Sequence, residues 1–226
     1  MPRPARHLVI AAALVLPPLT ACLPYTVGSS AQTVPARETT HSASYYFVPN
    51  AFKQPDDSIG APMSGVDYEW RHGLDAWSDV AFRLLPGGVT STYKRRFGTD
   101  TSHAVGARAF SIGAGIVNGG EHFLMEGTVM ASGREDATIT PYGGVRAMHV
   151  VPMTQGAVSD RPTVGVFGGM QLGSRWFSVR PELGVFYDHS ALGLRQSNLL
   201  FVPAITVMRS RRRDHHAPAS VLPRLP

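Results

Sequence analysis

The chain is poor in cysteine, in long apolar runs and in helical periodicity. Cys22 is the single cysteine among 226 residues, so internal disulfides, thiol catalysis and metal sites built on several cysteines are not expected. The apolar stretch from Leu8 to Leu16 is about half of the roughly 20 residues that a membrane-spanning helix needs. No long segment repeats apolar positions three and four residues apart, which argues against a helical domain.

The body of the chain also lacks an excess of either charge. The formal net charge is +5, but two arginines precede residue 8 and five follow Met208. The residues between them carry nearly equal numbers of basic and acidic side chains. We therefore expect no basic groove for phosphates and no nucleic-acid partner.

Alternation of apolar and polar residues fills most of the remaining sequence. In one such stretch, Val66 and Tyr68 point to one side of an extended chain, while Asp67, Glu69 and Arg71 point to the other. Comparable stretches recur along the chain. We expect about ten strands, at residues 41–49, 62–85 (a hairpin), 89–97, 103–117, 121–132, 139–151, 163–173, 176–188 and 197–208.

Short turns rich in glycine separate these stretches. Asn118-Gly119-Gly120 is the strongest two-residue hairpin signal, and no connection is long enough for a helical crossover. The pattern predicts an all-β fold, a single antiparallel up-and-down β-barrel over residues 41–208. Strands of this length cross a bilayer or form the wall of a small barrel.

The two ends of the chain differ in composition from this body. A basic head, a short apolar run and small residues over residues 1–21 describe a secretory signal, so we expect export. Residues 22–40 are rich in Ser, Thr and Pro, which predicts a flexible tether, and residues 209–226 predict a disordered basic tail.

Leu19-Thr20-Ala21-Cys22 resembles the lipobox of bacterial lipoproteins. The resemblance implies cleavage before Cys22 and acylation of that residue, hence a lipid anchor of the palmitate type. The alternative is an ordinary signal peptide that is cut after Ala31.

The polar strand faces mix charges of both signs. Buried charges persist only when they are paired, so a narrow barrel could hold these side chains as a network in its lumen. The alternative is a wet outer face of a soluble barrel with an apolar interior. The candidate network comprises Asp67, Glu69, Arg71, Arg83, Lys94, Arg146, Arg180 and Glu182, and Arg96, Arg108 and Glu126 share the pattern.

The hairpin from Tyr68 to Arg83 resembles those of bacterial outer-membrane β-barrel proteins: an aromatic-rich strand, a short turn containing Asp and an alternating strand. The resemblance implies a structural or transport-type barrel at the outer membrane, with the membrane as partner. The alternative is a lipid-anchored, lipocalin-like barrel in the periplasm or at the cell surface that binds a small apolar ligand.

Sequence patterns of enzymes and metal sites are weak. Asp188-His189-Ser190 lacks the strand-turn-helix context of a hydrolase nucleophile. His122 and Glu126 share a strand face but lie about 13 Å apart at ~3.3 Å per residue, too far to bind one ion. We expect no enzyme activity, no cofactor and no metal.

Overall fold

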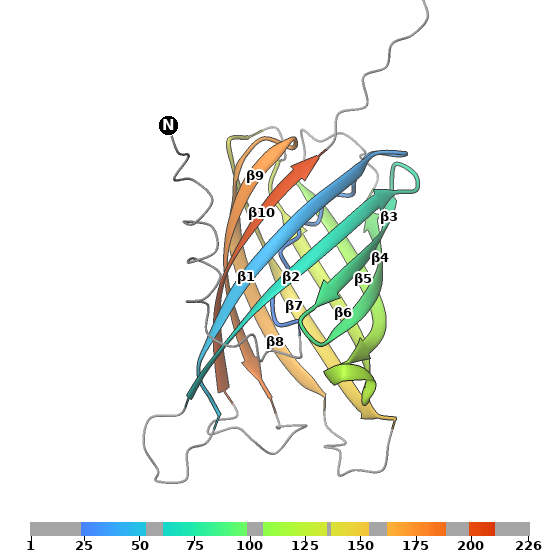
Figure 1. Ribbon diagram of the computed structural model, residues 1–226. Helices are drawn as coiled ribbons and strands as arrows, with labels where there is room; N and C mark the ends of the chain where they lie inside the picture. The colour runs from blue at the N-terminus through green and yellow to red at the C-terminus, as the bar shows by residue number, and fades with distance from the viewer. Residues whose placement is uncertain are drawn as a thin grey trace, which may run out of the picture.

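Figure 1 shows a closed β-barrel in the computed structural model of the chain. The structure describes residues 24–52, 61–98, 106–134, 137–153, 162–188 and 199–210. Within these residues each of ten antiparallel strands pairs with the next along the chain, and β1 pairs with β10, which confirms the predicted up-and-down barrel. The strands are β1 Thr39–Phe52, β2 Ala61–Gly73, β3 Ser78–Leu85, β4 Gly88–Phe97, β5 Ala107–Val117, β6 His122–Ser132, β7 Ile139–Pro152, β8 Thr163–Gly173, β9 Phe177–Tyr187 and β10 Leu199–Ser210.

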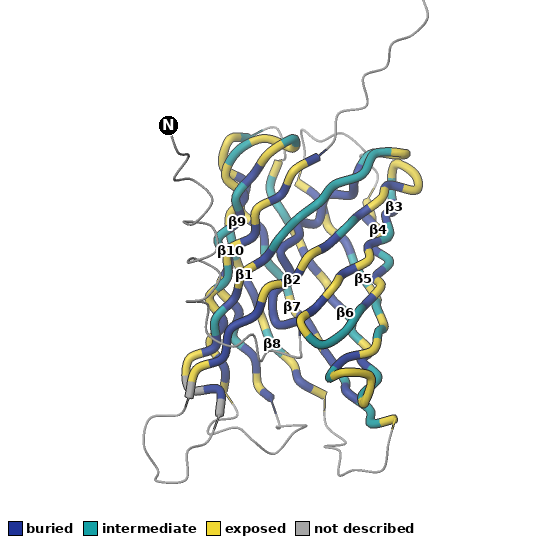
Figure 2. The backbone as a smooth tube through the Cα atoms, in the orientation of Figure 1, coloured by how far each residue is buried: buried dark blue, intermediate teal, exposed yellow. Residues whose placement is uncertain are grey.

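The alternation of side chains explains why these segments form the wall. Along β4, Thr90, Thr92, Lys94 and Arg96 are buried in the barrel, whereas Phe97 is exposed outside it. Figure 2 shows the same alternation of buried and exposed residues along the other strands. A strand turns its side chains over at every residue, so each strand contributes one face to the lumen and one to the outside.

The outward face is predominantly apolar. Val129, Val145 and Val166 are 53%, 53% and 54% exposed and lie opposite one another on β6, β7 and β8. Val185 of β9 and Phe201 of β10 continue this row. The outside of the barrel therefore carries a continuous apolar band that no described residue covers.

The two ends of the barrel differ in their connections. We call the end where β1 begins and β10 ends the terminal end, and the opposite end the loop end. At the terminal end, four, nine, six and three residues join β2 to β3, β4 to β5, β6 to β7 and β8 to β9. At the loop end the connections have eight, two, four, ten and eleven residues in chain order, and the four-residue connection contains the short 3₁₀ turn η1, Asn118–Gly120.

Residues 24–34 lie inside the barrel, and we call them the N-terminal plug. All of them are buried, and Figure 2 shows the dark blue segment within the ring of strands. Tyr25 packs against Phe186 near the loop end, and Ala36 forms a bridge to Gly73 at the terminal end. The plug thus runs through the lumen toward the start of β1. The prediction of a flexible tether over residues 22–40 is wrong for this segment, because the lumen satisfies its main-chain polar groups, and wrong for Thr39 and Thr40, which belong to β1.

The lumen has an apolar layer near the loop end. Its members are buried side chains from the loop ends of the strands, closed by one residue of the plug. The layer comprises Tyr25, Tyr46, Val48, Ala51, Met63, Leu85, Val117, Leu124, Met148, Val150, Phe186, Leu200 and Val202.

Several predictions on the chain ends lie outside the described residues: the signal peptide, Cys22 and the tail beyond Ser210. Arg209 and Ser210, which were predicted to be disordered, are part of β10. The described residues include no helix of sufficient length and apolarity to cross a membrane.

Candidate functional site in the lumen

A chain of ion pairs crosses β2, β3 and β4 on the lumen side. Arg71 Nε lies 3.0 Å from Glu69 Oε1, and Arg71 Nη1 lies 2.6 Å from Asp79 Oδ1. Arg83 Nη2 lies 2.8 Å from Glu69 Oε2, and Lys94 Nζ lies 3.4 Å from Asp79 Oδ2. The strand register creates this chain, because Glu69 is opposite Arg83 and Asp79 is opposite Lys94.

The other side of the lumen carries two more charged contacts. Arg146 on β7 forms an ion pair with Glu126 on β6. Arg180 Nε on β9 donates to Gln171 Oε1 on β8 at 3.1 Å. These cations therefore also have a partner in the barrel wall. Pairing of this kind offsets the cost of taking charges out of water.

The cations of the wall also bind carbonyl oxygens of the plug. Arg83 donates to the carbonyls of Thr26 and Val27 at 2.9 and 3.1 Å. Arg146 donates to the same Thr26 carbonyl at 2.9 Å, and Arg180 donates to the Gly28 carbonyl at 2.9 Å. Further along the plug, Lys94 Nζ donates to the carbonyls of residues 30 and 32 at 3.1 and 2.6 Å.

Acidic side chains bind the N–H groups of the plug. Glu182 accepts from the backbone N–H of Val27 at 2.8 Å and of Gly28 at 3.0 Å, and also from the hydroxyl of Tyr142 at 3.0 Å. Asp79 accepts from the N–H of the residue at position 34 at 3.0 Å. Most of the contacts that hold the plug thus involve its main chain. The lumen therefore binds this segment mainly through groups that every residue carries, and few side chains of the plug take part.

Gly28 is a point where the main chain of the plug lies close to the wall. Its φ of 60° lies in the left-handed region, which glycine adopts without steric cost. A Cβ at this position would lie 2.7 Å from Thr206 Oγ1 and 3.0 Å from Ser44 Oγ. A glycine here allows both the turn of the plug and its close approach to β1 and β10.

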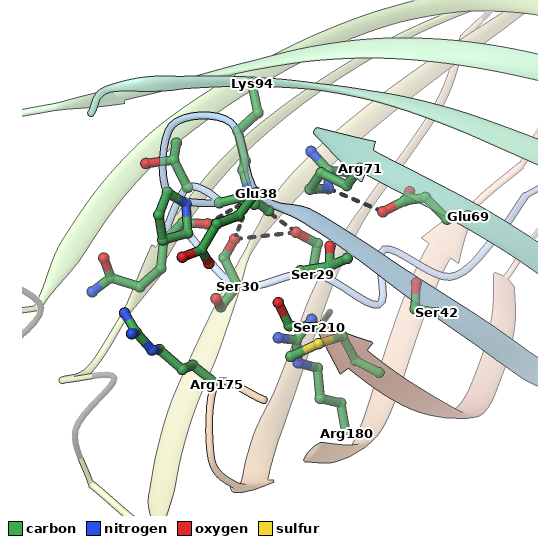
Figure 3. A pocket seen from close by; sticks show the side chains of 16 residues that line it. Ser29, Ser30, Glu38, Ser42, Glu69, Arg71, Lys94, Arg175, Arg180 and Ser210 are labelled. Atoms are coloured by element: carbon green, nitrogen blue, oxygen red, sulfur yellow. Dashed lines mark hydrogen bonds and ion pairs between the residues drawn. The ribbon is translucent and has the colours of Figure 1, made fainter. Parts of the chain in front are cut away.

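Little space remains beside the plug. Figure 3 shows a cavity toward the terminal end, among Ser29 and Ser30 of the plug and Arg71, Lys94 and Arg180 of the wall. Its volume is about 40 Å³, enough for only a few water molecules. The plug therefore closes the lumen in this structure.

All eight residues of the predicted network are buried in the lumen, and seven of them have the contacts described above. Asp67 is the eighth, and neither of its carboxylate oxygens has a hydrogen-bond partner among the described residues. Arg96 and Glu126 also face the lumen, but Arg108 is exposed and faces outward, because it precedes the buried Ala109 on β5.

Sequence reasoning missed Asp79 and the plug. Asp79 could have been found, because it lies two and four residues before Ala81 and Arg83 on the same face. The plug has no periodic pattern, and a segment rich in Ser and Thr is usually a linker. Among the residues that the structure describes, no group of three His, Cys, Asp or Glu side chains is arranged to hold a metal ion.

Comparison with known proteins yields remote structural similarity only. No protein-family model and no curated protein matches the chain. An outer membrane channel from Pseudomonas putida F1 is 9% identical, with a TM-score of 0.43 over 80% of this chain and 97% of that one. Neisserial surface protein A is 10% identical, with a TM-score of 0.33 over 76% and 96% of the two chains. The outer membrane protein OprG from Pseudomonas aeruginosa is 10% identical, with a TM-score of 0.31 over 82% and 100%. At these scores the similarities carry no argument about activity or substrate.

Proposed function

We propose that the chain is a β-barrel protein of the outer membrane, with a structural or transport-type role. The observation that supports this most is the distribution of its side chains, with an apolar band outside and paired charges inside. Water outside such a band would leave a large apolar surface exposed, whereas lipid would cover it. The lipocalin-like alternative lacks support, because the lumen is filled by ion pairs and the plug.

Aromatic residues near both ends of the barrel support the same proposal. Phe97 and Phe177 are exposed at the terminal end, and Tyr187 is exposed at the loop end. Aromatic side chains of membrane barrels gather where the apolar band meets the headgroups. In such barrels the short turns face the periplasm and the longer loops face outward. The two longest connections, of ten and eleven residues, belong to the loop end, so we infer that the terminal end faces the periplasm.

The test is the behaviour of the full mature chain in detergent and in water. We expect a monodisperse, folded barrel in detergent whose unboiled sample migrates differently from the boiled one on a denaturing gel. We expect aggregation when the detergent is removed. A chain that stays monomeric and folded in plain buffer would contradict the proposal.

We also propose that Cys22 carries a lipid anchor, on the strength of the lipobox-like motif. Metabolic labelling with a palmitate analogue tests this: the label should appear in the wild type and vanish in Cys22→Ser. Equal labelling of both would refute the anchor.

We propose a non-enzymatic role for the lumen. Its charged groups contact one another and the plug, and the cavity that remains is small. This arrangement supports holding a polypeptide segment rather than transforming a substrate.

A further inference from the structure

The charged side chains of the barrel wall have partners within the wall as well as in the plug. Arg83 has Glu69, Arg146 has Glu126 and Lys94 has Asp79, and each of these acids belongs to the wall. The remaining groups also have wall partners: Arg180 has Gln171, and Glu182 has Tyr142. Withdrawal of the plug would therefore leave three of these cations in ion pairs and the other two groups with a neutral hydrogen-bond partner, which lowers the cost of emptying the lumen.

The plug itself is not built into the sheet. Among the described residues 24–38, the bridge between Ala36 and Gly73 is the single strand-like pairing. It is supported by hydrogen bonds from Arg37 N–H to the Gly73 carbonyl and from Gly73 N–H to the Glu38 carbonyl, at 2.9 and 3.0 Å. Both lie at the terminal end, next to a left-handed Arg37 with φ of 66°. The plug is thus attached at one end through a bend and held elsewhere by side-chain contacts.

The plug contributes one side chain, Tyr25, to the apolar layer. Tyr25 is 1% exposed, its ring centroid lies 5.7 Å from that of Phe186, and its hydroxyl donates to Asp188 at 3.3 Å. The other members of the layer belong to the wall. Withdrawal of the plug would remove Tyr25 from this layer. It would also remove the plug's main chain from the part of the lumen that the charged side chains line.

We propose that residues 24–34 are a displaceable plug, and that its withdrawal opens a water-filled path through the barrel for small ions and polar solutes. The proposal rests on the proposed membrane-spanning function. A barrel that needs no detergent would refute that function. A barrel that inserts into bilayers but gives one of the contrary results named below would refute the displaceable plug and leave the proposed function unaffected.

A disulfide between the plug and the wall can lock the plug in place. A Cβ on Gly28 would lie 3.0 Å from Ser44 Oγ, a distance that suits a disulfide in a Gly28→Cys/Ser44→Cys pair. The same Cβ would lie 2.7 Å from Thr206 Oγ1, so Thr206→Ala accompanies the pair, and the reduced form of this variant is the control for the strain of a side chain at φ 60°. The native Cys22 is replaced by Ser in every variant, so that the introduced thiols are the only ones. The readout is ion conductance of the full mature chain in planar bilayers of phosphatidylcholine with KCl.

Glu182→Gln loosens the plug, because it weakens the hydrogen bonds from Val27 and Gly28. We expect the open time of the pore to rise about tenfold or more, the factor that one hydrogen bond to a charged group supports. Adding the oxidised disulfide should abolish the openings, and reduction should restore them. Asp67→Asn is the matched control, since Asp67 is a buried lumen carboxylate with no hydrogen bond to the plug among the described residues, and we expect less effect from it.

Thiol accessibility gives a second, independent readout. Ala31 is fully buried in the plug, so an Ala31→Cys thiol should react slowly with a charged, membrane-impermeant reagent. Adding Glu182→Gln should raise that rate about tenfold, matching the conductance. The proposal is overturned if folded, heat-modifiable protein never conducts, if oxidation leaves the conductance unchanged, or if Ala31→Cys stays equally unreactive in both backgrounds.

Discussion

The outward and inward faces of a single strand show how this barrel is organised. On β2, Val66 is 37% exposed and contributes to the apolar outside, whereas the next residue, Asp67, is 2% exposed inside. Glu69 and Arg71 on the inner face have ion-pair partners on β3, whereas the outer-face Trp70 contacts its exposed neighbours in the same sheet, as in its ring contact with Phe82. A soluble barrel has the opposite arrangement. The difference shows that the surroundings of the barrel, and not its interior, must accept its apolar side chains.

Loss of a shared inward carboxylate should have the largest effect. Glu69 binds both Arg71 and Arg83, so Glu69→Ala leaves two buried arginines short of a partner. We expect a loss of about 3–5 kcal/mol in the free energy of unfolding, measured by denaturant titration in lipid vesicles. The outward neighbour Val66→Ala is the control and should cost about 1 kcal/mol. Equal costs would show that the two faces do not differ.

Removal of a whole ion pair should cost less than removal of one partner. Glu126→Leu alone leaves Arg146 without its carboxylate, and we expect a cost of about 3 kcal/mol. Combining it with Arg146→Met should return at least about 1 kcal/mol, because no uncompensated charge then stays in the lumen. Additive costs in this double-mutant cycle would contradict a desolvated pair.

The smallest effect is expected in the turn between β2 and β3, which belongs to neither the inner nor the outer face of the barrel. A hydrogen bond from the backbone N–H of Trp77, further hydrogen bonds from Ser78 and the positive charge of the nearby Arg95 hold the pKa of Asp75 below its usual range. The stabilisation is thus present above the unfolded pKa of about 4 and is lost as the pH falls through the lower folded pKa. Since Asp75 is exposed, we expect Asp75→Asn to cost about 0.5 kcal/mol at pH 7. A cost that persists unchanged at pH 2 would contradict this origin.

The strands of the wall could be predicted from the sequence, because the alternation of apolar and polar residues along a strand shows which side chains share a face. Alternation placed Glu69, Arg83 and Glu182 on one face, and the glycine-rich turns indicated antiparallel hairpins. The direction of that face stayed open, since an apolar face can point to a core or to lipid. The wall therefore followed from local pattern, while its orientation needed the closed structure.

The plug could not be predicted in the same way. Its burial depends on carbonyl and N–H groups, which every residue carries, and these leave no pattern in the side chains. Thr26, Ser29 and Ser30 are typical of an exposed linker. The wall did carry a clue, because Arg83, Arg180 and Lys94 can donate more hydrogen bonds than their partners in the wall accept.

The most direct test of an apolar outside in contact with lipid is the cost of one arginine at two depths. Val145 and Ile139 face outward on β7 and are 53% and 57% exposed, but their separation of six positions corresponds to about 14 Å of depth on a strand tilted by about 45°. In vesicles, Val145→Arg at the middle of the strand should lower the free energy of unfolding by about 2–4 kcal/mol, and Ile139→Arg at its end by about 0–1 kcal/mol. Equal costs within about 0.5 kcal/mol would contradict a membrane-embedded barrel.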